Sequence, residues 1–287
     1  MAVFQLNNYE FDLLRNYIET NCGIHLDTSK SYLIENRLEA LMQEYGCSTF
    51  SAFYYKAVAD SSKKLQEKII DAITTNETLW FRDSLPFSIF QRKILPVYVN
   101  EMVSKKKNKV RIWSAACSTG QEPYSIAMNI HEFLRGKIDI RVDNFEIIAT
   151  DISSTVLNIA QAGIYDQLSV SRGLSEEMKN LYFEKSGTGW AVKDSVKRMV
   201  TFKKMNLKDD FWGIGNVDIV FCRNVLIYFA DDLKKQILNK IASLIKPSGI
   251  LIVGSSESVS NYTTEYSMVS VEKMLCYQVK GCPSLFS

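Results

Sequence analysis

The apolar residues in the first third of the chain recur every three or four positions, which is the spacing of an amphipathic helix. This spacing predicts four helices: one carried by Phe11, Leu14, Ile18 and Cys22, one from Thr28 to Gly46, and two shorter ones at residues 50–58 and 65–73. Thr28 is a good N-cap residue, and Gly46 is a typical helix end. The second helix has an apolar stripe of Ile34, Leu38, Leu41, Met42 and Tyr45. We therefore expect an N-terminal helical domain over residues 1–75.

The pattern changes at Val110, where short and continuously apolar runs replace the helical spacing. Such runs are typical of strands that are buried on both faces. The predicted strands are residues 110–113, 145–150, 199–205, 217–222 and 250–254, and helices are predicted between several of them at residues 123–134, 155–162 and 233–245. This alternation predicts a parallel sheet in a doubly wound α/β domain over residues 110–287, with residues 76–109 as an interdomain segment and helix.

Two stretches break the alternation of strands and helices. Residues 164–200 contain a polar helix candidate at 175–183, followed by Gly187-Thr188-Gly189, and they are too long for a simple loop. We therefore expect a small inserted subdomain there. Residues 266–280 have strand-like composition but no room for a crossover helix, which predicts an antiparallel hairpin on the edge of the sheet.

Composition and charge exclude several classes of protein. The net charge of +2 predicts no strong attraction to nucleic acid or to a membrane surface. No apolar run approaches the roughly 20 residues that span a bilayer, and the N-terminus has no basic-then-apolar leader pattern. Six scattered cysteines without a CxxC, and only two histidines, do not favour a structural zinc site, and they indicate free thiols in a reducing cytoplasm. The basic run at residues 105–109 is interpreted as a solvated turn, with a phosphate or membrane patch as the alternative.

The candidate ligand-binding residues lie beyond the carboxyl ends of the predicted strands, where open α/β sheets bind ligands. In residues 112–125, small residues between strand and helix allow a ligand to approach the backbone, although an ordinary tight connection has the same composition. Because Gly120 is the only glycine there, neither a GxGxxG loop nor a Walker loop is supported, and a nucleoside fits better. Asp151 follows the next strand, where it can accept two hydrogen bonds from a ribose diol or else cap the following helix.

A third strand, at residues 217–222, runs directly into Arg223-Asn224 and then towards Tyr228. Polar side chains in that position lie at the ligand edge of the sheet. For Tyr228 alone, a core tyrosine with a satisfied hydroxyl is the commoner outcome.

The stretch before the sheet carries Asn76, Thr78 and Arg82 within residues 74–83, which join the helical part to the sheet part. Such a segment could fold over a ligand held between two domains. Arg82 could bind a carboxylate bidentately, and a solvent-facing arginine beside a capped helix start is the alternative.

These segments together resemble the CheR family, the chemotaxis receptor glutamate methyltransferases. The matching stretches occur in the family's order from about residue 28 to 278 and are TTNETLWFRD, IWSAACSTGQEPYSIAM, ATDIS, FKKMNL, FCRNVLIYF and GILIVGSSES. The helix KSYLIENRLEAL also resembles the family's N-terminal domain. The resemblance implies a Rossmann-like class I methyltransferase domain with a small inserted β-subdomain, preceded by an N-terminal helical domain.

The resemblance also implies a cofactor and a reaction. S-adenosylmethionine would donate a methyl group to glutamates on the helical cytoplasmic part of chemoreceptors, leaving S-adenosylhomocysteine and requiring no metal. The residues implied to bind the cofactor are Asn76, Thr78, Arg82, Ala115, Glu122, Asp151, Asn206, Leu207, Arg223 and Asn224, of which Asn206 and Leu207 would flank the adenine. Arg82 and Tyr228 are implied to lie near the transferred methyl group. An ionised glutamate is already a nucleophile near pH 7, because its pKa is about 4.3, so no general base is needed.

The sequence departs from the family in two places. Gln121 stands where many members have a second acidic residue, although Glu122 remains. Residues 187–201 are shorter than the loop with which some members grip a receptor's C-terminal pentapeptide. We therefore expect an enzyme that works without this tether. Separately, we expect a monomeric cytoplasmic protein that binds no nucleic acid and does not insert into the membrane. Lys30 and Arg37 are seven residues apart on one side of a helix, and we hypothesise that they meet an acidic receptor helix, with a solvated surface as the alternative.

Two other functions are alternatives to a glutamate methyltransferase. A methyltransferase acting on a small molecule or RNA would share the sheet and Asp151, but it gives no reason for the helical N-terminal part, and the weak net charge argues against RNA. A non-catalytic signalling module that binds S-adenosylmethionine would keep Asp151 and Asn206 without needing Arg82 and Tyr228. Because both are present, an enzyme is favoured.

Overall fold

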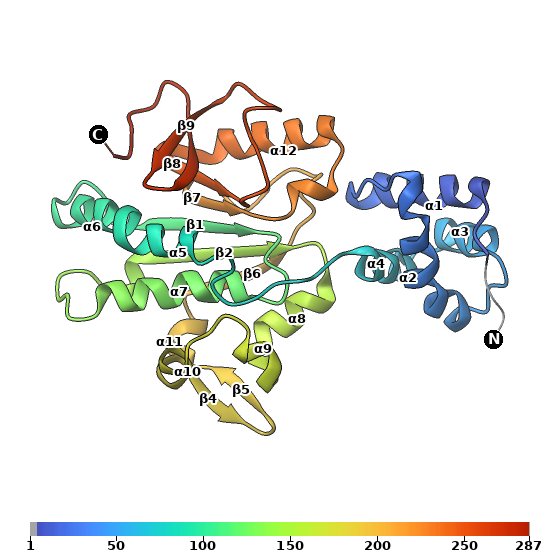
Figure 1. The fold of residues 1–287 in the computed structure, drawn as a ribbon, viewed down its shortest axis with the longest axis horizontal. Helices are drawn as coiled ribbons and strands as arrows, with labels where there is room; N and C mark the ends of the chain where they lie inside the picture. Colours follow the sequence, from blue (N-terminus) through green and yellow to red (C-terminus); the bar gives the residue numbers. More distant parts are fainter. Residues whose placement is uncertain (1–4, 287) are drawn as a thin grey trace.

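The structure is a computed structural model that describes residues 5–286. Four helices stand at one end of the molecule, and the rest of the chain surrounds a sheet (Figure 1). These helices are α1 (Asn8–Cys22), α2 (Ser31–Glu44), α3 (Phe50–Ala59) and α4 (Lys64–Ile73). All four lie where the apolar spacing predicts helices. Their buried side chains form a hydrophobic cluster separate from those of the sheet.

The start of the second predicted helix differs from the expectation. Asp27, not Thr28, is the capping residue, and its side chain accepts from the backbone N–H of Ser29. Thr28 instead opens a short 3-10 helix, Thr28–Lys30, that leads into α2. The prediction of Thr28 as N-cap is therefore wrong, because Asp27 caps the 3-10 helix, and α2 itself begins at Ser31 after Lys30, which makes no side-chain cap bond.

The central sheet has seven strands in the order β6-β2-β1-β7-β8-β10-β9. Their bounds are β1 Val110–Ala115, β2 Phe145–Asp151, β6 Val200–Lys204, β7 Val217–Cys222, β8 Ile245–Val253, β9 Tyr266–Val271 and β10 Met274–Val279. Strands β6, β2, β1, β7 and β8 pair in parallel, and β10 pairs antiparallel with both β8 and β9. The parallel sheet and its antiparallel edge hairpin are both as predicted. Chain order reverses at β1, between β2 and β7, so a crevice opens beyond the strand ends there.

Helices cover both faces of this sheet (Figure 1). One face carries α5 (Leu85–Ile89), a π-helical turn at Phe90–Ile94, α6 (Leu95–Val103) and α7 (Gln121–Leu134), and α12 (Asp231–Leu244) covers the other. The segment predicted to be interdomain thus contributes its helices to the sheet core, where Phe90 packs on Phe221 at 5.7 Å between ring centroids. We accordingly propose that the two parts of the chain divide near residue 75, at the start of the linker.

The insertion after α8 (Ser154–Ala162) is a small sheet with three helices. Its strands are β3 Ile164–Tyr165, β4 Phe183–Ser186 and β5 Gly189–Val192, and its helices are α9 Gln167–Ser171, α10 Glu176–Tyr182 and α11 Asp194–Lys197. Trp80, from the linker, packs edge-on against Tyr165 and Phe183 and donates from Nε1 to Ser169 O at 3.1 Å. The insertion therefore also anchors the segment that precedes the sheet.

Other expectations from composition can be followed in the structure. All six cysteines are free, as expected. In the basic run, Lys107 pairs with Asp218 at 2.5 Å and Lys109 with Glu146 at 3.0 Å, which supports the interpretation as a turn. None of the helices that the structure describes has both the length and the apolar character needed to cross a bilayer.

Candidate active site

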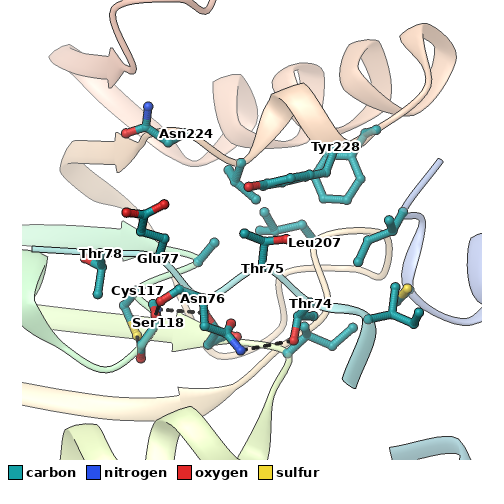
Figure 2. A pocket seen from close by; sticks show the side chains of 18 of the residues that line it. Thr74, Thr75, Asn76, Glu77, Thr78, Cys117, Ser118, Leu207, Asn224 and Tyr228 are labelled. Carbon is teal, nitrogen blue, oxygen red and sulfur yellow. Dashed lines mark hydrogen bonds between the residues drawn. The ribbon is translucent and has the colours of Figure 1, made fainter. Parts of the chain in front are cut away.

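A cavity lies between the helical part of the chain and the carboxyl ends of β1, β2, β6 and β7, and the linker at residues 74–83 crosses it (Figure 2). Figure 2 shows Asn224 and Tyr228 on one side of the cavity, facing linker residues that include Thr75. Nine of the ten residues expected to bind a cofactor line this cavity, together with Tyr228: Asn76, Thr78, Arg82, Glu122, Asp151, Asn206, Leu207, Arg223 and Asn224. Side chains from widely separated parts of the sequence thus converge on one place.

Ala115 is the exception among the expected residues. It is the last residue of β1, is 1% exposed and packs in the core beneath the cavity. Ala116 lines the cavity in its place, with a left-handed φ of 57°. The chain leaves the strand geometry at this residue, so the expected contact moves one position along the sequence.

The turn after β1 forms the floor of the cavity. Three of its residues have left-handed backbone conformations: Ala116, Ser118 (φ 51°) and Gly120 (φ 94°). At Gly120 a side chain would also collide, because a Cβ would lie 2.9 Å from Ala160 Cβ. The turn is anchored to the next strand, since Cys117 N donates to Thr150 O at 2.9 Å. A tight turn of small residues therefore brings backbone close to the cavity, as the sequence predicted.

Asp151 stands at the end of β2 and is 7% exposed. Its Oδ2 accepts from Ser118 N at 2.8 Å and its Oδ1 from Ser153 N at 3.0 Å. Burial raises the pKa of Asp151 above its usual value, and these backbone N–H bonds oppose the rise. The cap of α8 is Ser153, which accepts from Val156 N, so Asp151 is not the helix cap. Each carboxylate oxygen keeps a second acceptor site, which leaves capacity for two hydroxyl groups of a ligand.

Arg223 joins three segments from a buried position beside the cavity. Its Nη1 donates to Glu122 Oε2 at 3.0 Å, and its Nη2 donates to Asp83 Oδ2 at 2.7 Å and to Arg82 O at 2.8 Å. The side chain is 1% exposed, and the guanidinium lies over the Phe87 ring. Glu122, in the first turn of α7, also accepts from Ser114 Oγ at 2.7 Å. Arg223 therefore uses both Nη groups to hold the linker to the sheet, while its buried Nε has no partner. Its place after a strand did not reveal this role.

The linker that carries Asn76, Thr78 and Arg82 is held at both ends. Ser118 Oγ donates to Asn76 O at 2.9 Å, and Phe81 N donates to Ser125 Oγ of α7 at 3.1 Å. Within the linker, Arg82 Nη1 donates to Glu77 O at 3.0 Å. Phe81 has a left-handed φ of 49°. The Arg82 side chain is half-buried at the cavity, where its guanidinium can meet a carboxylate.

Arg37, one of the two residues of the hypothesised docking face, holds the same linker from the helical side. Its Nη1 donates to Ile73 O at 2.5 Å and to Thr74 O at 3.1 Å, and its Nη2 donates to Thr75 Oγ1 at 3.1 Å. These bonds give Arg37 a structural role at the end of α4, and its docking on a receptor stays a hypothesis. Lys30 pairs with Asp27 at 3.3 Å and lines the cavity.

The roof of the cavity comes from the loop after α1, which the sequence analysis missed. Ile24 forms an isolated antiparallel bridge with Phe229, and His25 N donates to Tyr228 O at 2.8 Å. Gly23 permits this turn after α1, because its φ of 78° lies in the left-handed region that favours glycine, and a Cβ there would also displace the Leu233 side chain, 2.4 Å away. The only signal for this loop in the sequence was Gly23, between the end of a helix and the apolar Ile24. A glycine predicts a turn there, but it does not predict which distant residues the loop contacts.

Asn206 and Leu207 close the cavity beyond β6. Asn206 Nδ2 donates to Asn21 O at 2.8 Å, and Leu207 is 6% exposed. Gln121, the departure from the family pattern, accepts from Thr119 Oγ1 at 2.8 Å and is not among the described residues that line the cavity. An apolar side chain beside an amide suits a planar base, and Asp151 lies at the neighbouring strand end.

Comparisons with known proteins agree with this arrangement. Residues 9–74 match the family model described as CheR methyltransferase, all-alpha domain, and residues 76–275 match that of CheR methyltransferase, SAM binding domain. Chemotaxis protein methyltransferase Cher2 of Pseudomonas putida is 42% identical over 274 residues, covering 95% of this chain and 98% of the relative. The chemotaxis protein methyltransferase of Vibrio parahaemolyticus is 41% identical, covering 98% of this chain and 100% of the relative. That of Salmonella typhimurium is 32% identical, covering 92% and 88%.

Proposed function

This chain belongs to the CheR methyltransferase family and is an S-adenosylmethionine-dependent methyltransferase of chemotaxis, and we propose that its acceptors are glutamate side chains of chemoreceptors. The product would be a γ-glutamyl methyl ester. The observation that carries this proposal is the convergence of Asp151, Arg82 and Tyr228, from a strand end, the linker and a later turn, on one cavity.

The donor set of the cavity fits S-adenosylmethionine. Asp151 is a buried carboxylate with acceptor capacity for a ribose diol. Asn206 and Leu207 offer an amide and an apolar surface for the adenine. Arg82 and Asn76 come from the linker, where they can reach the amino-acid part of the cofactor. We propose these residues, with Thr78, Glu122, Asn224 and the Ala116 backbone, as the binding set.

The bound cofactor supplies an electrophilic methyl group on a sulfonium. In the proposed reaction the glutamate carboxylate oxygen forms a bond to the methyl carbon while the carbon–sulfur bond breaks, and S-adenosylhomocysteine leaves as a neutral thioether. The chain need not move a proton, because the acceptor is ionised near neutral pH. Its contribution is to orient the reactants and exclude water. Arg82 can orient a carboxylate, and Tyr228 can fix the acceptor or pack beside the methyl group.

The proposed acceptor is an acidic helix in the cytoplasmic part of a receptor. We propose that it approaches the cavity past Lys30, whose side chain is 43% exposed at the helical wall. We further propose that the enzyme acts as a monomer in the cytoplasm without a pentapeptide tether. The shortness of the β4–β5 turn, at residues 187–188, supports the last point.

The test is transfer of a labelled methyl group. The purified chain is incubated with methyl-labelled S-adenosylmethionine and receptor-containing membranes, with an Asp151→Asn variant as the control for cofactor-dependent transfer. We expect label on the receptor that is released by mild base, as a methyl ester requires. Base-stable label, label in RNA only, or no transfer despite tight binding of the cofactor would falsify the proposal.

A further inference from the structure

The turn after β7 carries two of the polar side chains of the cavity, Asn224 and Tyr228. Asn224 is left-handed, with φ 57°, and Leu226–Tyr228 then form a 3-10 helix. In a turn of this kind successive backbone N–H groups point to one side and form a concave anion-binding nest. The first N–H groups of a helix also lack partners within the helix. The turn therefore needs an acceptor from another part of the chain.

Glu257 supplies that acceptor from the loop after β8. Its Oε2 accepts from Asn224 N at 2.7 Å and from Gly254 N at 2.7 Å, and its Oε1 accepts from Val225 N at 3.0 Å and Leu226 N at 2.8 Å. One carboxylate thus receives four backbone N–H groups, two on each oxygen. Bonds to an ionised acceptor are stronger than neutral ones. Three consecutive residues of the turn are fixed by a single side chain.

Gly254 makes this close approach possible. A Cβ there would lie 2.8 Å from Asn224 Nδ2, 2.8 Å from Glu257 Oε2 and 3.0 Å from Asn224 N. These contacts include backbone and the carboxylate itself, so they cannot all move aside. Gly254 and Glu257 therefore depend on each other: the missing side chain of the glycine leaves the space that the carboxylate occupies.

Glu257 does not belong to the described residues that line the cavity, so its effect on a ligand must pass through the turn. Because its carboxylate occupies the nest, the carboxylate of a cofactor or of an acceptor cannot bind there. We propose that Glu257 is a positioning residue for methyl transfer, which holds Asn224 and Tyr228 where the cofactor and the acceptor glutamate meet. This proposal rests on the proposed function and adds a residue to its machinery.

The first test is Glu257→Gln. The shape is kept, but whichever way the amide is turned, its NH2 group faces two N–H donors, so the turn must shift. We expect the dissociation constant for S-adenosylhomocysteine to rise about tenfold, and the single-turnover rate at saturating cofactor to fall by at least about tenfold. Glu257→Asp keeps the charge and should recover part of the rate. The matched control is Glu272→Gln, an exposed carboxylate that pairs with the side chains of Arg92 and Lys93 and should change neither quantity.

The second test is a double-mutant cycle with Tyr228→Ala. If Glu257 acts through Tyr228, then Glu257→Gln should lower the rate much less in the Tyr228→Ala background than in the wild type. A merely structural carboxylate would lower only the stability and leave affinity and single-turnover rate unchanged, or it would give the same fold loss of rate in both backgrounds. Either of these results overturns the proposal. If Glu257→Gln does not fold, Gly254→Ala, which separates the same groups without removing the carboxylate, takes its place under the same criteria.

The experiments distinguish a failure of the proposed function from a failure of the role proposed for Glu257. If the wild type methylates no glutamate, the proposed function is wrong. The binding of S-adenosylhomocysteine to Glu257→Gln, compared with Glu272→Gln, then still decides whether Glu257 positions the cavity. An unchanged dissociation constant would overturn that role.

Discussion

The two walls of the cavity are held in place in different ways. On the sheet side, buried or half-buried carboxylates bind backbone or guanidinium groups: Asp151 takes two N–H groups, Glu257 takes four, and Glu122 takes Arg223. On the helical side, the contacts with the sheet part are scattered single bonds. Asn206 and Lys208 donate to the main-chain carbonyls of Asn21 and Thr20, and exposed side chains form the pairs Lys204–Glu67 and Thr155–Asp71. The helical core is a separate hydrophobic cluster.

This difference indicates that the two walls of the cavity have different roles. Charged groups that make several bonds in a buried or half-buried position resist displacement, so the sheet wall should have the same shape with and without a ligand. Domain contacts that rest on a few polar bonds at the margin open more readily. We therefore expect changes on the sheet wall to reduce stability or cofactor affinity strongly. Changes on the helical wall should have smaller effects, mostly on how the linker and acceptor are presented.

The largest effect is expected for Arg223→Met. This change leaves the carboxylates of Glu122 and Asp83 without their cation, and breaking a buried ion pair on one side lowers the free energy of unfolding by about 3 kcal/mol. Urea denaturation measures it. Adding Glu122→Gln should restore part of the stability, because the unpaired charge is the main penalty. Arg92→Met, at an exposed pair, is the control, with a loss below about 1 kcal/mol. Equal losses in the two variants would contradict the contrast between walls.

The next effect is on cofactor binding. Asp151→Asn replaces an acceptor by an amide whose NH2 faces Ser118 N or Ser153 N, and it removes the charge that would bind a ribose diol. We expect the dissociation constant for S-adenosylhomocysteine to rise on the order of 100-fold, measured by titration calorimetry. Asp143→Asn, an exposed carboxylate beside Arg141, should leave it unchanged. A change of less than about threefold at Asp151 would contradict its assignment.

A pH titration sharpens the same point. Because burial raises the pKa of Asp151, this group takes up a proton at a higher pH than an exposed aspartate does. Only the ionised form gives charge-assisted bonds, so affinity for S-adenosylhomocysteine should fall as the pH is lowered through the raised pKa. The Asp151→Asn variant should lack this step. If both proteins show the same pH profile, another group is responsible.

The sequence predicted the elements well, because their apolar spacing survives any tertiary arrangement. It also found Asp151, Asn224 and Arg223, since polar residues directly after buried strands lie at the ligand edge whatever the rest of the fold does. Residues such as Glu257 could not be found in this way. Its role depends on three N–H groups about thirty positions earlier in the chain, which no local pattern reports.

Arg37 and the roof loop show a second limit of sequence reasoning. Helical spacing places Arg37 on one side of α2, but it does not say that the end of α4 lies against that side. Ile24 and His25 belong to a short loop, and their partners, Tyr228 and Phe229, are set by how the helical part packs on the sheet. Contacts between the helical part and the sheet part are therefore what the sequence pattern mainly failed to predict.

On the helical wall, Arg37→Met should give an intermediate effect. It removes three bonds that fix the linker, so we expect the dissociation constant for S-adenosylhomocysteine to rise about tenfold and the free energy of unfolding to fall by about 1 kcal/mol. Arg15→Met, on α1 and paired with Asp12, is the control in the same helical part of the chain, away from the residues that line the cavity. Unchanged cofactor binding together with weaker receptor methylation would favour the docking role for Arg37.

The smallest effect is expected for Lys30→Glu, which tests what remains of the docking hypothesis. Lys30 is half-exposed, and its pair with Asp27 is a surface ion pair that contributes little to stability. Charge reversal should repel an acidic receptor helix, raising the KM for receptor about threefold at low salt, with the difference shrinking as salt is added. The dissociation constant for S-adenosylhomocysteine should stay within about twofold of wild type, since the cofactor contacts proposed above lie on the linker and sheet.

Lys137→Glu, an exposed lysine just after α7, is the matched charge reversal on the sheet part. Equal effects of the two reversals on the receptor KM would mean a general charge effect and no docking at Lys30. If neither changes it, the helical wall serves only to close the cavity, and the acceptor must be guided by the sheet side and the linker. A selective effect of Lys30→Glu would instead give the helical wall a function of its own, presenting the acceptor to a site that the sheet wall has already shaped.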